Sequence, residues 1–375
     1  AIAFKLTFLS IASYTNFPVP KSPLGNKSPF SPIINFLFAA AAFCSDNSPC
    51  TAHDVPPRYR EEMRSFIKKI SAYAKAQNPH FVVIPQNGQT VAWDSDVPTD
   101  ENGVPLTEAD ASYMDAIDGC GREDTFYGEK GAGKATSSRA SAYFVGTCKK
   151  FSEKGKTVFS IDYCSSRAAI ADSYAKNAAA GFIGFAAPDR NLALIPEQSG
   201  YGREYYPYRK NRNDVTKLSD VKNFLFLLGM SSGDADGSAL IEKIRATDYD
   251  AVIMDAFVDG GDVPFSRAAV ESIKKKASGG ARFVIAYMSI GEAEDYRRYW
   301  DTRWVRGKKL TKNAPAWLDK LNPDWKGNYK VRYWNEDWQT VICGGEDSYI
   351  QKIIDAGFDG VYLDIVDAYE YFEER

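Results

Sequence analysis

Carboxylates that directly follow predicted strands are the residues best suited to chemistry in this chain. The stretch Gly357–Tyr371 opens with a Gly-Phe-Asp-Gly turn, continues through the apolar run Val361–Leu363 and then places Asp364 and Asp367. A short apolar run without a helical period is typical of a strand buried on both faces. An acid at the carboxyl end of such a strand stands where (β/α)8 barrels hold their catalytic groups, although the same position also suits a helix N-cap or an ion pair.

Polar side chains at the ends of other predicted strands repeat this pattern. We expect them to meet Asp364 in one barrel mouth: Gln86, Asn87, Glu123, Asp162, Tyr163, Asp255, Tyr287 and Glu292. Two carboxyls of this set would form a catalytic pair, and the other side chains, together with Asp367, would bind substrate. Each alone is more simply explained as structural, but clustered like charges are costly unless something cationic binds. Such a mouth suits glycoside hydrolysis, which needs one carboxyl as acid/base and another as nucleophile.

Scarce histidines and the cysteine spacing exclude several other chemistries. The only histidines are His53 and His80. A Ser-His-Asp triad needs a positioned imidazole and a histidine-based zinc site needs several, so the sequence supports neither well. The six cysteines contain no C-x-x-C pair, and we expect no metal and no cofactor. Cys44 and Cys50 could close a small disulfide loop in an oxidising compartment, and the other cysteines are expected to be buried thiols.

Charge and the first 56 residues bear on partners and compartment. The net charge of −3 argues against a nucleic-acid partner bound through phosphates. Residues 1–56 are rich in Pro, Ser and Asn, and Ile33–Phe43 is too short to span a bilayer but right for the core of a signal peptide. We expect 1–56 to be a leader and the protein to be secreted, with a disordered tail as the alternative. No other stretch approaches a membrane span.

Strands alternate with helical segments along the rest of the chain. We expect strands at His80–Gly88, Met114–Glu123, Thr157–Cys164, Gly181–Ala187, Asn223–Gly229, Tyr249–Ala256, Ala281–Ser289, Lys330–Trp334 and Val361–Leu363. This alternation implies a parallel sheet, and the number of strands favours a closed (β/α)8 TIM barrel over an open doubly wound sheet. No Gly-x-Gly-x-x-Gly motif follows the first strand. We therefore expect one barrel domain over 57–375, with halves 57–200 and 222–375 joined by a linker at 201–221.

Several long motifs resemble one family of barrel proteins. YMSIGEAEDYRRYW (Tyr287–Trp300), NPDWKGNYKVRYW (Asn322–Trp334) and GFDGVYLDIVDAYEY (Gly357–Tyr371) resemble glycoside hydrolase family 114, the endo-α-1,4-polygalactosaminidases. IPQNG (Ile84–Gly88), IDGCGREDTFYG (Ile117–Gly128) and FSIDYC (Phe159–Cys164) are also similar to a bacterial and archaeal extracellular branch of that family.

The resemblance implies roles for several residues. It puts the nucleophile at Asp364 and the acid/base at Glu123, with Asp255, Tyr287, Asp162 and Asn87 lining the sugar subsite. The family's substrate, a partly deacetylated galactosamine polymer, carries ammonium groups that an acidic mouth would favour. The resemblance also favours retention of anomeric configuration, for which the two carboxyls should lie about 5–5.5 Å apart. We expect the pKa of Glu123 to be the higher of the pair, raised by Asp124 and Asp162.

The order of these motifs departs from the family. There, the YMSIGEAED and GFDGVYLDIVDA motifs precede the IPQNG, REDTFYG and IDYC motifs, whereas here the halves are exchanged. A circular permutation explains this, and so does a fragment of two tandem barrels or a mis-assembled reading frame. The permutation predicts that the strand near Asn223 pairs with Thr157–Cys164, and that the strand ending at Asp364 pairs with His80–Gly88.

Two other functions compete with hydrolysis. A barrel that binds carbohydrate without cleaving it would share the fold and the mouth, and binding of polymer without release of reducing ends would identify it. A Schiff-base aldolase needs a lysine at a strand end, and the only candidate is Lys330, at a strand start. We expect a monomer that acts on a polysaccharide containing amino sugars.

Overall fold

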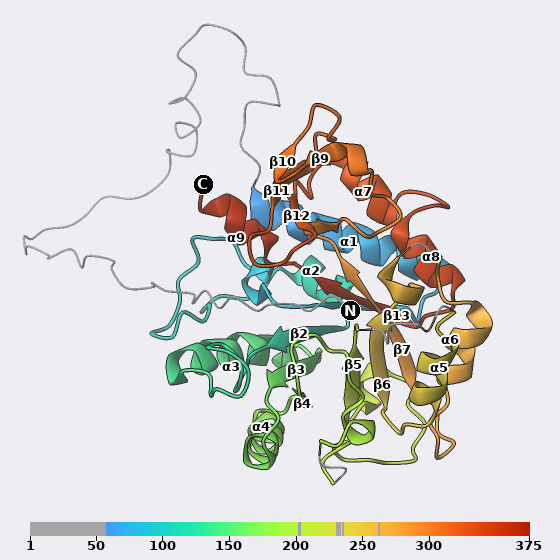
Figure 1. Cartoon of the computed structure of the whole chain (residues 1–375). Helices are drawn as coiled ribbons and strands as arrows, with labels where there is room; N and C mark the ends of the chain where they lie inside the picture. The colour runs from blue at the N-terminus through green and yellow to red at the C-terminus, as the bar shows by residue number, and fades with distance from the viewer. Residues whose placement is uncertain (1–57, 202–203, 230–233, 235, 262) are drawn as a thin grey trace, which may run out of the picture. The chain divides into compact units, whose positions relative to one another are not determined.

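Parallel strands form the centre of the protein, with helices outside them (Figure 1). The computed structural model describes residues 58–201, 204–229, 234, 236–261 and 263–375. The expected leader 1–56, including Cys44 and Cys50, lies outside the described residues. The central strands are β1 (Val82–Pro85), β2 (Gly119–Glu123), β3 (Thr157–Tyr163), β4 (Ile183–Ala187), β5 (Phe224–Leu227), β6 (Ala251–Asp255), β7 (Phe283–Ser289) and β13 (Gly360–Asp364).

The helices follow or precede these strands in alternation. They are α1 (Tyr59–Gln77), α2 (Ala111–Ala116), α3 (Ser138–Glu153), α4 (Arg167–Ala180), α5 (Ser238–Arg245), α6 (Arg267–Ile273), α7 (Glu336–Cys343), α8 (Tyr349–Asp355) and α9 (Ala368–Glu373). Short 3-10 turns lie at η1 (Gln89–Ala92), η2 (Pro196–Gln198), η3 (Leu218–Asp220), η4 (Val258–Gly260) and η5 (Thr302–Trp304). Serines cap several helices: the Ser137, Ser166 and Ser266 hydroxyls each accept a bond from a first-turn backbone N–H. No helix among the described residues is long and apolar enough to cross a membrane.

The strands pair in two parallel sheets that meet at β1 and β2. One sheet has the order β5-β6-β7-β13-β1 and the other β2-β3-β4. A parallel bridge joins Gln86 to Gly121, and the Asn87 N–H donates to the Gly121 carbonyl at 2.9 Å. The row of strands is therefore β5-β6-β7-β13-β1-β2-β3-β4, which is consistent with a TIM-barrel-like fold.

Aromatic side chains from strands at both ends of this row fill the interior. The Phe224 ring of β5 packs against Phe159 of β3 at 5.0 Å and against Phe185 of β4 at 5.5 Å between centroids. Phe226 of β5 lies 5.2 Å from Tyr362 of β13. These contacts bring the two ends of the row toward one core, although no strand pair joins β4 to β5 in the described part of the chain.

One of the two strand pairings predicted from the permutation is confirmed and the other is wrong. β13 pairs in parallel with β1, with Tyr362 opposite Ile84. β5 does not pair with β3, because β4 occupies that edge of β3. The order of strands around such a barrel is the same whichever strand comes first in the chain, so the exchange of halves stays a hypothesis.

Two other sequence predictions need correction. Met114 lies in α2 and not in a strand, because the Asp110 carboxylate accepts the Tyr113 N–H at 2.7 Å and caps a helix there. The segment predicted as a strand at Lys330–Trp334 contributes to β12 (Asn328–Val331), which runs antiparallel to β11 (Leu318–Leu321) and β8 (Glu292–Glu294) outside the central sheet. Another small hairpin, β9 (Val305–Arg306) with β10 (Lys309–Leu310), lies in the same insertion.

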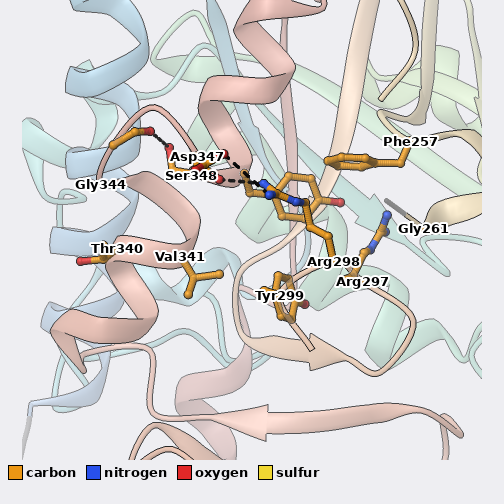
Figure 2. A pocket seen from close by; sticks show the side chains of 12 residues that line it. Phe257, Gly261, Arg297, Arg298, Tyr299, Thr340, Val341, Gly344, Asp347 and Ser348 are labelled. Atoms are coloured by element: carbon orange, nitrogen blue, oxygen red, sulfur yellow. Dashed lines mark hydrogen bonds and ion pairs between the residues drawn. The ribbon is translucent and has the colours of Figure 1, made fainter. Parts of the chain in front are cut away.

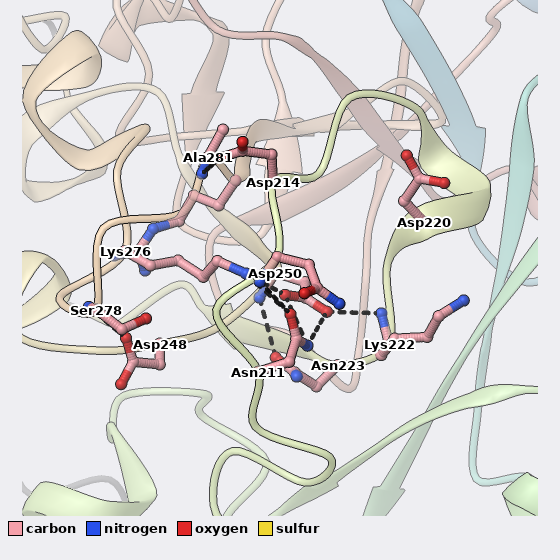
Figure 3. Close-up of polar contacts among 12 residues, drawn as sticks. Asn211, Asp214, Asp220, Lys222, Asn223, Asp248, Asp250, Lys276, Ser278 and Ala281 are labelled. Atoms are coloured by element: carbon pink, nitrogen blue, oxygen red, sulfur yellow. Dashed lines mark hydrogen bonds and ion pairs between the residues drawn. The ribbon is translucent and has the colours of Figure 1, made fainter.

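Residues 204–221 cross the amino ends of the strands and are attached there by a buried ion pair (Figure 3). The Asp250 carboxylate, just before β6, lies 2.8 Å from the Lys276 ammonium, and both side chains are fully buried. It also accepts the Asn211 side-chain N–H at 3.0 Å and the Lys222 backbone N–H at 2.8 Å. The expected linker is therefore fixed against the barrel through its contact with Asp250.

The helix before β1 and the helix after β13 lie side by side (Figure 1). Arg60 of α1 forms an ion pair with Glu373 of α9 at 2.9 Å, and the Tyr59 ring stacks on Phe372 at 5.4 Å. α1 thus covers the junction between β13 and β1, where a continuous chain would place its crossover helix.

Candidate active site

Glu123 and Asp364 lie close together at the carboxyl ends of β2 and β13, with β1 between these strands. Gln86, directly after β1, reaches both carboxyls. Its Nε2 donates to Glu123 Oε2 at 2.9 Å and to Asp364 Oδ1 at 3.2 Å. These two oxygens are therefore no farther apart than the sum of those distances, which is below the spacing of about 6.5 Å at which inverting glycosidases begin.

A tyrosine holds the other oxygen of each carboxyl. The Tyr163 hydroxyl, at the end of β3, donates to Glu123 Oε1. The Tyr287 hydroxyl of β7 donates to Asp364 Oδ2 at 2.6 Å. Asn87 adds a bond from its Nδ2 to Glu123 Oε2 at 2.9 Å. Four residues predicted from strand ends thus position the pair: Gln86, Asn87, Tyr163 and Tyr287.

Unusual backbone conformations surround the pair. Asn87, Asp124 and Ile365 all have positive φ, at 57°, 58° and 58°. A β-branched residue such as Ile365 rarely adopts this conformation, and such strain concentrates at functional sites. The sharp turn at Ile365 lets its own N–H donate to Asp364 Oδ1 at 2.8 Å. The turn therefore contributes a further bond that orients the carboxyl.

Burial, and after it the nearby Glu123 carboxylate, raise the pKa of Asp364 to about 8 against the lowering effect of the Tyr287 hydrogen bond. The sequence prediction placed the higher pKa of the pair on Glu123. That ordering stays a prediction. Two carboxyls at this spacing share protons as a unit, so near neutral pH the pair holds a proton.

Asp255 lies in the neighbouring part of the mouth but is already paired. Both of its oxygens contact Arg297, from Nη1 and Nη2 at 2.9 Å each. Arg297 also donates from Nε to Glu294 at 2.6 Å, so one guanidinium neutralises two carboxylates. The sequence analysis did not single out Arg297 or Glu294, although the i,i+3 spacing of this oppositely charged pair was visible.

Two of the predicted substrate ligands are buried and fully engaged elsewhere. Asp162 accepts bonds from the Phe126 and Tyr127 N–H groups, the Ser173 hydroxyl and the Asn177 amide. Glu292 forms an ion pair with Lys330 at 2.6 Å and accepts amide bonds from Asn322 and Asn328. Both side chains are structural in this conformation: Asp162 fixes the loop after β2, and Glu292 joins β8 to β12.

Asp367 stands at the rim, before α9. A β-carbon added at Gly88 would lie 2.8 Å from the Asp367 backbone nitrogen, so the turn after β1 packs tightly on this residue. Burial raises the pKa of Asp367. Within the described part of the chain, no lysine or arginine forms an ion pair with Glu123, Asp364 or Asp367. The mouth therefore carries carboxyl groups that a cationic ligand could compensate.

A hollow lies beside Arg297 and not at the pair (Figure 2). It measures about 290 Å³, and its walls include Phe257, Arg298 and Tyr349. The hydrogen-bond partners of the pair, Gln86, Asn87, Tyr163 and Tyr287, do not line it, so the chemistry of the strand ends, and not this hollow, defines the candidate site. Among the described residues no group of three or more His, Cys, Asp or Glu side chains is arranged to hold a metal ion.

Comparison with known proteins finds similarity over part of the chain. Residues 239–375 match the model described as glycoside-hydrolase family GH114. An uncharacterized protein of Methanocaldococcus jannaschii is 38% identical over 195 residues, 52% of this chain and 50% of that protein. Uncharacterized proteins of Deinococcus radiodurans and Thermotoga maritima are 37% and 35% identical, over 37% and 36% of this chain and 40% and 37% of those proteins. The chain thus spans half or less of the length of these curated relatives.

Proposed function

Because residues 239–375 match the model of glycoside hydrolase family GH114, we propose that this protein is a retaining glycosidase that cleaves α-1,4-linked, galactosamine-containing polysaccharide. Asp364 lies inside the matched segment, and Glu123 lies outside it. The observation that carries the proposal is the Gln86 amide, which contacts both carboxyls at 2.9 and 3.2 Å. That spacing leaves little room for a water between the carboxyls, as inversion requires, and favours direct attack by one of them.

The proposed reaction proceeds in two displacements. In the first, an Asp364 oxygen bonds to the anomeric carbon while the glycosidic C–O bond breaks, and the leaving oxygen takes a proton from Glu123. In the second, Glu123 removes a proton from water, the water oxygen bonds to the anomeric carbon, and the bond to Asp364 breaks. Tyr287 and the Ile365 N–H orient the nucleophile through their bonds to Asp364.

The raised pKa of Asp364 connects this mechanism to an amino-sugar substrate. With a pKa of about 8, Asp364 is mostly protonated at neutral pH and in that form cannot act as a nucleophile. An ammonium group bound in the mouth favours the ionised carboxylate and lowers that pKa. The proton of the pair then resides on Glu123, as the first displacement requires. Deacetylated galactosamine units carry such a group, whereas N-acetylated units do not.

Variants of the two carboxyls test the proposal. Asp364→Asn and Glu123→Gln keep the shape of the side chains and should each abolish most release of reducing ends from partly deacetylated α-1,4-galactosaminan. Asp355→Asn, at an exposed position of α8, serves as the control and should cleave like the wild type. Fully N-acetylated polymer should be cleaved more slowly at neutral pH than the deacetylated form.

Azide separates the two roles. When azide replaces the missing group, a nucleophile variant gives a glycosyl azide of inverted configuration, and an acid/base variant gives one of retained configuration. We expect inversion for Asp364→Ala and retention for Glu123→Ala, which leave room for azide where the isosteric amides do not, read by NMR of the anomeric proton. Wild-type turnover in both carboxyl variants would refute the assignment. Polymer binding by the wild type without any release would instead identify a non-catalytic carbohydrate-binding protein.

A further inference from the structure

A half-exposed tyrosine stands beside the mouth, directly after β8. Tyr296 is 49% exposed, although its ring lies next to a buried carboxylate. A β-carbon placed on Gly260 would be 3.5 Å from Tyr296 Cε2 and 3.7 Å from Asp255 Oδ2. The ring and the Asp255 carboxylate are therefore neighbours at the end of β6.

Ionic contacts hold this tyrosine in place. Its hydroxyl donates to Glu294 Oε1, whose other oxygen accepts the Arg297 Nε–H at 2.6 Å. The Arg297 guanidinium carbon lies 5.0 Å from the centre of the Tyr296 ring, and the same guanidinium binds Asp255. One side of the ring thus meets a buried cation while about half of the side chain remains in solvent. A ring fixed in this way loses little conformational entropy when a ligand stacks on its free face.

The register of the sheet gives the place of this ring relative to the pair. Asp255 of β6 lies opposite Tyr287 of β7, and β7 in turn pairs with β13, which ends in Asp364. Adjacent strands are about 4.8 Å apart, so β6 lies about 10 Å from β13 across the mouth. Tyr296 stands on this β6 side of the mouth, next to Asp255, so a group stacked on its ring binds to one side of the pair and not between the two carboxyls.

We propose that Tyr296 forms an accessory polysaccharide subsite, where its ring stacks on the apolar C–H face of a pyranose beyond the cleaved bond. This inference rests on the proposed function. It also gives Asp255, Glu294 and Arg297 a different role from that expected of Asp255: they are positioning residues that hold the ring, and do not bind sugar themselves. Because stacking uses the carbon face of a sugar, this subsite accepts acetylated and deacetylated units alike.

Binding measured without hydrolysis tests the subsite. In the Asp364→Asn background, calorimetry with galactosaminan should show that Tyr296→Ala weakens binding about 10-fold, the loss of about 1.4 kcal/mol of contact. Tyr296→Phe keeps the ring and should retain most of the affinity. Tyr73→Ala, which removes a partly buried tyrosine on α1, is the matched control and should bind like the parent.

Kinetics of the active enzyme give a second readout. Tyr296→Ala should raise KM for the polymer about 10-fold with a much smaller change in kcat, because the ring binds ground state and transition state equally. Unchanged affinity and KM in Tyr296→Ala would overturn the subsite while leaving the proposed function intact. Tyr296-dependent binding by a wild-type protein that releases no reducing ends would support the subsite and refute the hydrolase.

Discussion

Replacing Asp364 with asparagine should stabilise the protein, and by an amount that grows with pH. The Asp364 carboxyl has a pKa of about 8 in the folded protein, against about 4 in an unfolded chain. Between these values the folded state keeps a proton that the unfolded state has lost, so raising the pH favours unfolding. The wild type should lose about 1.4 kcal/mol of stability per pH unit from this group, to a total of at most about 5 kcal/mol.

Asparagine cannot ionise, so Asp364→Asn escapes this loss. Its amide oxygen can still accept the Tyr287 hydroxyl, which limits other effects of the substitution. Urea unfolding of both proteins at half-unit steps from pH 5 to 9 gives the difference in the free energy of unfolding. The difference should increase up to about pH 8 and stay constant above it.

Asp124→Asn provides a control in which the stability gain should stop growing at a different pH. Burial raises the pKa of Asp124 to about 6 against the lowering effect of its ion pair with Arg190. The pH-dependent gain from Asp124→Asn should therefore stop near pH 6, superimposed on a constant loss from the broken ion pair. A stability difference for Asp364→Asn that does not change between pH 5 and 8 would show that Asp364 is ionised in the folded protein over that range, and would refute its protonation at neutral pH.

Three further substitutions probe the framework. Gln86→Leu removes both hydrogen bonds to the site carboxyls and should reduce kcat by roughly 10- to 100-fold, because hydrogen bonds to charged groups contribute about 1.5–3 kcal/mol. The rate is measured as reducing-end release, and thermal unfolding checks that the variant is still folded. Lys276→Met leaves Asp250 buried without its cation and should cost about 3–5 kcal/mol in urea unfolding, much of it recovered by adding Asp250→Asn. Gly121→Ala should cost about 1–3 kcal/mol, because the added β-carbon would lie 1.8 Å from the Tyr362 hydroxyl oxygen, and Tyr362→Phe should restore part of that loss.

Apolar runs ending in polar residues predicted the central strands well. The run before Asp364 became β13, and the run before Gln86 became β1, because strands buried on both faces leave a strong signal in sequence. Local capping was harder to foresee: Asp110 competes with a strand and starts α2. The position of β4 at the edge of β3, which separates β5 from β3, depends on long-range packing and leaves no local signal.

Which strand-end acids face the mouth could not be predicted from their spacing. Glu123 and Asp364 share a hydrogen-bond donor, whereas Asp162 turns inward to four donors of its own. The two kinds of acid differ in their hydrogen-bond donors, and several of these donors come from distant parts of the chain. Arg297 shows the same limit, because its contact with Asp255 joins residues 42 apart in sequence.

The pairing of β1 with β13 also determines when function can appear during folding. Gln86 and Asp364, which meet across this junction, are separated by 278 residues. At about 20 residues per second, the ribosome makes β1 on the order of ten seconds before β13. Until then β1 lacks its neighbour, and closing so long a loop is slow and entropically costly. The two carboxyls therefore come together only as the last strand docks, so catalytic activity would report completion of the fold.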